Sequence, residues 1–369
     1  LRAVKADYVE SYFETIERQL RVLSGDLMVR EAMEGFSEAF AGLETELGER
    51  WSTDRARLEA GLLERYRYQL AHTEGAEDAP LDDWMPGSVR ERLLQALYIG
   101  GNPHAVGEKH RLDDAGDGSR YSALHDHFHP VFREFLEEFG YYDLFLVEPE
   151  TGHVVYSVFK EVDYATSLLD GPWAESGIGR AFRAALATED PAAIAFEDYS
   201  AYGPSYGDPA AFAASPIHDA EGRRIGVAIF QMPVDRIDTI MQERAGLGES
   251  GETYLVGSDG LMRSDTRFSE SPTILKQAVN TATARAALAG ETVIDIVEDD
   301  RGVPVLSAAA PIDVLGARYA IVAEIDAEEA FASTTGLRDL IVGGLGVVLL
   351  LVIATGALVA TRITKPVLA

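Results

Sequence analysis

A run of 21 residues without a charged side chain, Leu340–Ala360, constrains this chain more than any other feature of its sequence. At a rise of about 1.5 Å per residue, a helix of that length spans about 31 Å, which matches the roughly 30 Å hydrocarbon layer of a bilayer. A helix inside a soluble protein is rarely apolar on all sides over such a length. We therefore predict one transmembrane helix, with a buried helix of a large soluble protein as the alternative interpretation.

The charges beside this run predict its orientation. Arg362 and Lys365 follow it directly, and every acidic residue lies at or before Asp339. The positive-inside tendency then places the C-terminus in the cytoplasm and residues 1–339 outside, across the cytoplasmic (inner) membrane. Export of so large an acidic region further predicts an uncleaved membrane helix upstream of Leu1, continued by the first apolar positions of the chain.

The composition excludes several classes of function. Acidic residues outnumber basic ones by 61 to 32, and such a field repels nucleic acid and anionic headgroups, so we expect no nucleic-acid partner. The chain has no cysteine, which excludes disulfides, zinc-thiolate sites and thiol catalysis. The absence of cysteine is compatible with a periplasmic location, because an oxidising compartment does not require disulfides.

The N-terminal part of the chain has the pattern of helices. From residue 1 to about residue 70, apolar residues recur at alternating steps of three and four, which predicts helix throughout. Acidic, Gly- and Pro-containing stretches at 72–86 and 100–118 predict surface loops around a helix at 89–98. A further helix is expected at 121–139.

From residue 141 the period becomes that of strands. Apolar residues at 144–147 and 153–158 flank a Pro-Glu-Thr-Gly turn, which predicts a hairpin. A helix at 173–187 and three strands at 193–199, 211–217 and 224–232 follow. This order describes one five-stranded antiparallel sheet with helices on one face.

The same pattern then recurs. Residues 252–260 repeat the first hairpin, residues 309–312 (Ala-Ala-Pro-Ile) repeat 214–217 (Ala-Ser-Pro-Ile), and residues 319–326 repeat the strand that contains Gln231. The repeat predicts two copies of one α/β module in tandem. The last strand of the second copy runs almost directly into the membrane helix.

This layout resembles the double-Cache sensor domains of bacterial chemoreceptors, sensor kinases and membrane nucleotide cyclases. The matching motifs are residues 142–152 (Tyr-Asp-Leu-Phe-Leu-Val-Glu-Pro-Glu-Thr-Gly), 155–160 (Val-Tyr-Ser-Val-Phe-Lys), 214–217 with Gly222 and Gly226, and 251–260 (Gly-Glu-Thr-Tyr-Leu-Val-Gly-Ser-Asp-Gly). Residues 363–366 (Ile-Thr-Lys-Pro) resemble the start of a HAMP linker. The family's amino-acid-binding pattern, clustered Tyr, Arg and Trp followed by Asp, is not found in its usual order.

The resemblance implies an α+β fold with a long N-terminal helix, a helical elaboration, two PAS-like five-stranded modules and one transmembrane helix. The expected divisions are 1–130 (helices), 131–235 (membrane-distal module), 236–337 (membrane-proximal module), 338–361 (membrane helix) and 362–369 (start of HAMP). It also implies a homodimer, and a periplasmic binding protein is a possible partner.

In modules of this kind the ligand cavity lies between the sheet and the helices that follow its second strand, so the resemblance implies a pocket around Lys160. A cation there suits a ligand carboxylate. The predicted ligand-binding residues are Tyr156, Lys160, Trp173, Asp198, Tyr202, Tyr206 and Phe212. The alternatives are a rim salt bridge from Lys160 to Glu161 or Asp163, and aromatic residues that are plain core.

A second cluster, His125, His127 and His129, places two imidazoles four residues apart on one helical face. Such a pair holds a metal if a third ligand approaches, for example Asp126 or Asp143. The competing interpretation, which we prefer, is that the histidines are surface or helix-start residues. We predict no metal, no cofactor and no catalytic residues in this segment, because Gly-x-Ser-x-Gly, phosphate-binding and EF-hand patterns are missing.

The function that these features predict is ligand sensing outside the cell by a transmembrane receptor, with a methyl-accepting chemotaxis protein as the first choice. The sensor of a nucleotide cyclase, histidine kinase or phosphatase fits equally well. Two other classes stay open: an interaction module without a small ligand, and an extracytoplasmic enzyme that uses the histidines.

Overall fold

The computed structural model describes residues 1–364, without the side chains at 49, 50, 52, 53, 333–339 and 361–364. Two long helices open the chain, α1 (Arg2–Gly25) and α2 (Leu27–His72). Asp26 breaks the helix between them with extended backbone angles, and its carboxylate accepts the Met28 N–H at 2.8 Å as the N-cap of α2. Gly48, at φ 37° and ψ −116°, bends α2. The predicted helix over residues 1–70 is therefore two helices, the second of them kinked.

A set of further helices follows α2, and all of them except the 3-10 helix contact it. The set comprises α3 (Leu81–Trp84), α4 (Val89–Gln95), the π-helix η1 (Ala96–Gly100), the 3-10 helix η2 (Lys109–Arg111) and α5 (Arg120–Phe139). The predictions of helix at 89–98 and 121–139 are confirmed. Gly61 and Gly100 let α2 and η1 approach closely, because a Cβ added at Gly61 would lie 2.4 Å from the Gly100 carbonyl oxygen.

The first module contains a five-stranded antiparallel sheet of order β2-β1-β5-β4-β3. Its strands are β1 (Asp143–Val147), β2 (Val154–Ser157), β3 (Ala195–Ala201), β4 (Pro209–His218) and β5 (Arg224–Met232), and α6 (Gly177–Ala187) packs against β3 and β4. The five strands predicted here are confirmed. β1 and β2 are buried along their whole length because both faces are covered.

The second module has four strands, not the predicted five. Its order is β6-β9-β8-β7, with β6 (Glu252–Val256), β7 (Val293–Glu298), β8 (Pro304–Val314) and β9 (Ala317–Asp326); α7 (Asp235–Gln242) precedes it and α8 (Ala282–Leu288) covers one face. The segment at the position of β2 makes only isolated bridges, Val256 to Met262 and Leu261 to Ala278. The Leu255 N–H donates to the Ser264 hydroxyl at 3.0 Å, so its acceptor is a side chain and not the backbone carbonyl of a neighbouring strand.

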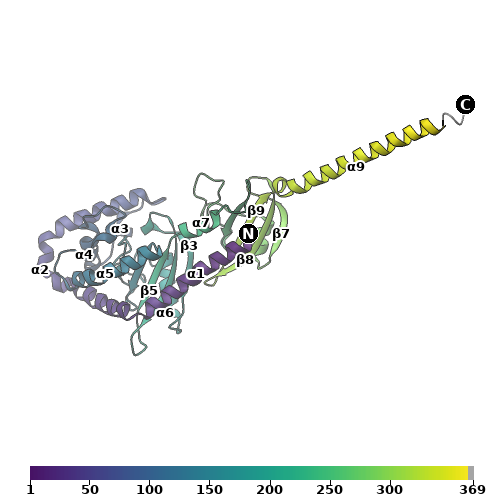
Figure 1. The fold of residues 1–369 in the computed structure, drawn as a ribbon. Coiled ribbons are helices and arrows are strands. Elements are labelled where there is room, and N and C mark those ends of the chain that lie inside the picture. Colours follow the sequence, from purple (N-terminus) through teal and green to yellow (C-terminus); the bar gives the residue numbers. More distant parts are fainter. Residues whose placement is uncertain (365–369) are drawn as a thin grey trace.

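Helix α1 joins the two modules along their length (Figure 1). It contacts β4 and β5 of the first sheet and β8 and β9 of the second, and its buried stripe includes Val9, Phe13, Ile16 and Leu20. Near its start, Lys5 Nζ donates to the carbonyls of Met241 and Glu243 at 2.6 and 2.8 Å. The N-terminus therefore lies at the second module, at the same end of the molecule as the final helix (Figure 1).

That final helix, α9 (Ala327–Thr364), begins at the residue after β9 and projects away from both sheets (Figure 1). Within the described residues, α9 contains the one helix segment that is long and apolar enough to cross a membrane, Leu340–Ala360, and none of that segment is buried in the protein. The expected HAMP start at 362–369 lies mostly outside the described residues, which end at Thr364.

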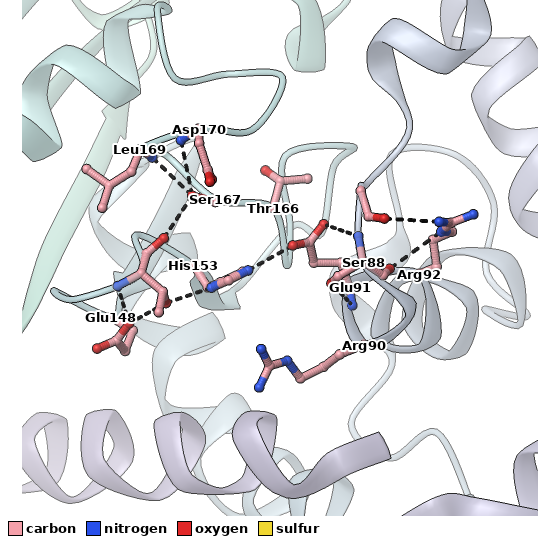
Figure 2. Close-up of polar contacts among 12 residues, drawn as sticks. Ser88, Arg90, Glu91, Arg92, Glu148, His153, Thr166, Ser167, Leu169 and Asp170 are labelled. Carbon is pink, nitrogen blue, oxygen red and sulfur yellow. Dashed lines mark hydrogen bonds and ion pairs between the residues drawn. The ribbon is translucent and has the colours of Figure 1, made fainter. Parts of the chain in front are cut away.

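A polar contact fastens the helical part to the first sheet (Figure 2). Glu91 closes the capping box of α4, where its carboxylate accepts the Ser88 N–H, and it also accepts from His153 Nε2 at 2.8 Å. The other ring nitrogen of His153, Nδ1, lies 2.6 Å from the Thr151 hydroxyl in the β1–β2 turn. Burial raises the pKa of Glu91, but the hydrogen bonds from His153 and Ser88 outweigh it and lower the pKa overall.

Candidate functional site

The segment after β2 carries the predicted cation, and its backbone is strained. Lys160 has φ 58° and Ala165 has φ 66°, so two of the five described non-glycine residues with positive φ lie within this short stretch. Such conformations cost about 1–3 kcal/mol each and gather at functional sites. Hydrogen bonds hold them in place: the Lys160 N–H donates to Ser157 Oγ at 2.8 Å, and the Ala165 N–H donates to the Val154 carbonyl at 3.0 Å.

The Lys160 side chain is fully buried, at 0% exposure. Its Nζ donates to the Val158 carbonyl at 3.0 Å and lies 5.7 Å from the ring centroid of Tyr98 and 5.8 Å from that of Tyr156. Among the described residues, no carboxylate oxygen lies within 4.0 Å of Lys160 Nζ, the longest distance at which an ion pair is counted. An ammonium group has three N–H donors, and one is satisfied here.

Two buried histidines of α5 complete what we call the Lys160 cluster, which comprises Tyr98, His125, His129, Tyr156 and Lys160. The rings of His125 and His129 stack with centroids 4.2 Å apart, and His129 Nδ1 lies 2.6 Å from the Tyr156 hydroxyl. Burial and the positive charge of Lys160 lower the pKa of His125 well below its usual value and that of His129 to about 2. Both imidazoles are therefore neutral at neutral pH.

Burial also lowers the pKa of Lys160 well below its usual range, and the negative charge of Asp143 opposes this shift. Asp143 is itself fully engaged, because its carboxylate accepts from Ser157 Oγ at 2.7 Å and from the N–H groups of Leu144, Val158 and Phe159. Burial raises the pKa of Asp143 to about 6. The site thus holds a buried amine, and the acid that most raises its pKa already has its hydrogen bonds.

The alternative of a rim salt bridge for Lys160 is wrong. Glu161 pairs instead with Lys109 at 2.6 Å, and both of those side chains are buried. Asp163 accepts from the Tyr202 hydroxyl at 2.5 Å. Neither acid bonds Lys160, which lies inside the protein and not at its edge.

Three of the other predicted residues gather around Tyr202, whose hydroxyl bonds Asp163. The Tyr202 ring lies 6.1 Å from Trp173 and 5.0 Å from Phe212, centroid to centroid. Burial raises the pKa of Asp163 to about 7, with the charge of Asp143 as the second cause, and Asp163 Oδ1 has no hydrogen-bond partner in the described part of the chain. Gln95 of α4 holds the backbone between this group and the Lys160 cluster, because its Nε2 donates to the carbonyls of Val162 and Tyr164 at 3.0 and 2.6 Å.

The last two predicted residues lie elsewhere. Asp198 points to the second module, where it forms an ion pair with Arg263 at 2.8 Å and accepts from the Tyr319 hydroxyl. Tyr206 lies near the end of α2, with its ring 6.4 Å from that of Tyr68. The structure therefore brings together Tyr156 with Lys160, and Trp173 with Tyr202 and Phe212, but not Asp198 or Tyr206.

The histidine motif is not a surface feature, which corrects the preferred interpretation. His125 and His129 are buried in the face that α5 turns to the sheet, while His127 is exposed. Over the described residues, no group of three His, Cys, Asp or Glu side chains has an arrangement that could hold a metal ion. His125 Nδ1 lies 2.5 Å from the Asp113 carbonyl, and His125 Nε2 has no partner in that same part of the chain.

Sequence reasoning missed Tyr98, Asp143 and Asp163 as members of the site. Asp143 opens the first strand motif, and its position before an apolar run was a usable signal. Tyr98 comes from a helix that is distant in sequence, and no local pattern indicated that it would cover Lys160. A cavity of about 590 Å³ at the junction of the two modules, lined among others by Tyr142, Gln231 and Leu275, contains none of the predicted site residues.

The Cache domain family model matches residues 111–334, which is more than half of the chain. The chain belongs to the Cache domain family. Among curated proteins, none matches this Cache chain.

Solved structures that resemble the Cache chain include sensor domains of chemoreceptors. One is the ligand-binding domain of the Pseudomonas aeruginosa PAO1 amino acid chemoreceptor PctC in complex with GABA, with 18% identity, TM-score 0.36, and coverage of 50% of this chain and 74% of that one. Another is the ligand-binding domain of the Pseudomonas fluorescens chemoreceptor CtaA in complex with L-leucine (15%, 0.35, 52% and 73%). A third is the periplasmic sensory domain of the Campylobacter jejuni chemoreceptor Tlp1 (13%, 0.42, 64% and 91%).

Proposed function

We propose that this chain is the extracytoplasmic sensing region of a bacterial transmembrane receptor whose first module binds a small carboxylate-bearing molecule at Lys160. The observation that carries the proposal is the burial of Lys160 without an acidic partner among the described residues. Removing a charged ammonium from water is costly unless it is paired and hydrogen-bonded, so an unpaired buried lysine is poised to take an anion.

A ligand carboxylate would accept the two N–H donors of Lys160 that the protein leaves free. Such charge-assisted hydrogen bonds are about twice as strong as neutral ones, and the low dielectric of this interior strengthens them further. The rings of Tyr98 and Tyr156 would contact the carbon skeleton of the ligand. Because these rings are packed tightly, entry of the ligand requires the strained segment around Lys160 and Ala165 to move.

That movement would be the signal. The Lys160 segment directly follows β2, which pairs with β1, and β1 pairs with β5. The first sheet contacts the second module through the ion pair of Asp198 with Arg263 and through the shared helix α1. Since β9 runs into α9 without a linker, a ligand with different affinities for two arrangements of the modules would shift the membrane helix.

The same proposal covers organisation and output. We place residues 131–235 farthest from the membrane and 236–337 next to it, with residues 338–361 in the inner membrane, the start of a HAMP linker at 362–369, and a homodimer as the working unit. The output is that of a methyl-accepting chemotaxis protein. A nucleotide cyclase, histidine kinase or phosphatase output is the alternative, and the sequence beyond Ala369 would decide between them.

One observation favours a second candidate function, an interaction module that binds a protein such as a periplasmic binding protein. Tyr156, Tyr202 and Phe212 are each at most 1% exposed and packed against neighbouring rings. Aromatic residues that fill their own space leave less room for a small molecule.

The experiment is a ligand screen on the 369-residue chain in lipid nanodiscs. Monocarboxylates, dicarboxylates and amino acids are tested by thermal shift, and positives are measured by isothermal titration. We expect a carboxylate to raise the Tm of the wild type, and the Lys160→Met variant to show no such shift. A wild-type protein that responds to no carboxylate, or a Lys160→Met variant that responds equally, would rule out this site.

A further inference from the structure

The second module contains a cavity of its own, about 480 Å³ in volume. It lies against the ends of β6 and β9, under the segment between β6 and α8, and beside the β7–β8 turn. Its lining combines acidic and aromatic side chains with one arginine, Arg301; the acids include Glu252, Asp299 and Glu324, and the aromatic residues are Tyr254 and Phe268.

Two glutamates face each other in this cavity. Glu252 of β6 and Glu324 of β9 are direct cross-strand partners and are 8% and 4% exposed. Tyr254, two residues after Glu252, lies on the same side of the sheet. Like charges directly opposite on neighbouring strands destabilise a sheet, and burial adds to the cost. A cation between the two carboxylates would remove both penalties.

Among the described residues, no cationic side chain forms an ion pair with either glutamate; the charge of Arg301 lowers the pKa of Glu252, but burial outweighs it and raises that pKa overall. Glu252 accepts a hydrogen bond from the Thr266 hydroxyl, and Glu324 Oε1 is buried without a hydrogen-bond partner in the described part of the chain. Arg301 also lines the cavity, but its guanidinium pairs with Asp299 at 2.6 Å and Asp326 at 2.9 Å. Glu324 therefore lines the cavity with a carboxylate of which one oxygen has no hydrogen-bond partner among the described residues.

The first module has different residues at the corresponding position of its sheet. Asp143 opens β1 as Glu252 opens β6, and its cross-strand partner is Gln231 where the second module has Glu324. Asp143 has four hydrogen bonds and lies near the positive Lys160, whereas Glu252 lies opposite a second acid. The first module thus has a buried amine without an acidic partner among the described residues, and the second has two buried acids opposite each other. A ligand of the second module would therefore be cationic.

We propose that the second module binds a small organic cation, with its ammonium or guanidinium group between Glu252 and Glu324 and its carbon skeleton against Tyr254. Aromatic rings attract such cations, as Phe268 shows within the protein, where the guanidinium carbons of Arg301 and Arg267 lie 4.6 and 4.7 Å from its ring centroid. This site is separate from the one at Lys160 and does not depend on it.

An inorganic ion is a poorer match. Ca²⁺ takes six to eight oxygen ligands in a close shell, and across the described residues no group of three acidic or metal-binding side chains is arranged to hold a metal. The aromatic wall of the cavity offers nothing to such an ion, but it suits the hydrocarbon part of an amine.

The test uses putrescine, agmatine and tetramethylammonium chloride as probes on the full chain in nanodiscs, by isothermal titration and thermal unfolding. Two variants neutralise the pair without changing its shape, Glu324→Gln and Glu252→Gln. The matched control is Asp295→Asn, an exposed acid on β7 of the same module. Lys160→Met separates this proposal from the one on the first module.

We expect wild type, Asp295→Asn and Lys160→Met to bind at least one probe and to gain Tm with it. Each glutamine variant should lose about tenfold or more in affinity, the effect of removing one charged hydrogen-bond partner. Three results would overturn the proposal: no binding of any probe by the wild type, binding that both glutamine variants retain, or a CaCl₂ titration that produces the same Tm gain and displaces the amine.

Discussion

Asp198 and Arg263 join the two modules through an ion pair of 2.8 Å in which the arginine side chain is only 3% exposed. Asp198 lies on β3 of the first sheet, and Arg263 follows β6 in the second module. Arg263 also pairs with Asp259, and the Tyr319 hydroxyl of β9 donates to Asp198. A residue that sequence reasoning assigned to ligand binding is therefore part of the contact between modules, and Tyr319 links it to the strand that enters the membrane helix.

Asp198→Asn should weaken this coupling. The substitution leaves Arg263 buried with Asp259 as its remaining acid, and we expect a loss of about 2 kcal/mol in unfolding free energy. All three tryptophans, Trp51, Trp84 and Trp173, lie outside the second module. Urea unfolding followed by tryptophan fluorescence should therefore coincide with far-UV circular dichroism in the wild type and separate in the variant. Asp259→Asn, which removes a more exposed partner, is the control, and coincident transitions in Asp198→Asn would contradict the coupling.

Two of the buried lysines, Lys160 and Lys109, should respond in opposite ways to the same substitution. Lys160→Met removes an amine without an acidic partner among the described residues, and we expect a gain of about 1–3 kcal/mol in unfolding free energy, since an apolar residue fits a buried site better. Lys109→Met leaves the buried Glu161 unpaired and should cost about 3–5 kcal/mol. Chemical denaturation of both variants at one pH checks this. Two losses of similar size would mean that Lys160 has a partner in solution.

Much of the fold was predictable because its signals are local. The apolar runs at residues 144–147 and 211–217 and the Pro-Glu-Thr-Gly turn predicted strands that the structure contains. The repeat at 252–260 predicted the second module. The same repeat predicted one strand too many in the second module, because the segment after β6 makes only isolated bridges there and the sheet has four strands.

The site was less predictable because it depends on contacts across long stretches of sequence. Lys160 was predicted from the family resemblance, which implies a pocket beside the segment after the second strand, but the resemblance did not show that Tyr98 in a distant helix would cover it. Asp198 lies on the same strand as predicted, yet its partner Arg263 is 65 residues away. The period of a strand gives the face on which a side chain lies, and it does not give what packs against that face.

The raised pKa of Asp163 should make the free energy of unfolding fall as pH rises. Its pKa is raised by burial to about 7 in the folded protein, so the folded state binds more protons than the unfolded state between the ordinary pKa of an aspartate and that value. The stabilising contribution is present at low pH and is lost as pH rises through about 7. We expect Asp163→Asn to lose less stability than the wild type between about pH 5 and about pH 9. Urea midpoints across this range give the comparison, with exposed Asp170→Asn as the control; parallel curves for wild type and Asp163→Asn would contradict the shift.

Carboxylate binding at Lys160 should be coupled to proton uptake. Burial lowers the pKa of Lys160 well below its usual range in the empty protein, so its amine is largely neutral when the pH exceeds that lowered value. A bound carboxylate favours the charged ammonium and raises the pKa again, which draws a proton from solution. Affinity should therefore fall as pH rises above the lowered pKa. Titration of the same carboxylate in phosphate and in Tris at one pH measures the protons taken up, because the two buffers differ in ionisation enthalpy. Equal heats in both buffers, together with an affinity independent of pH, would show that the anion is bound by a group other than Lys160.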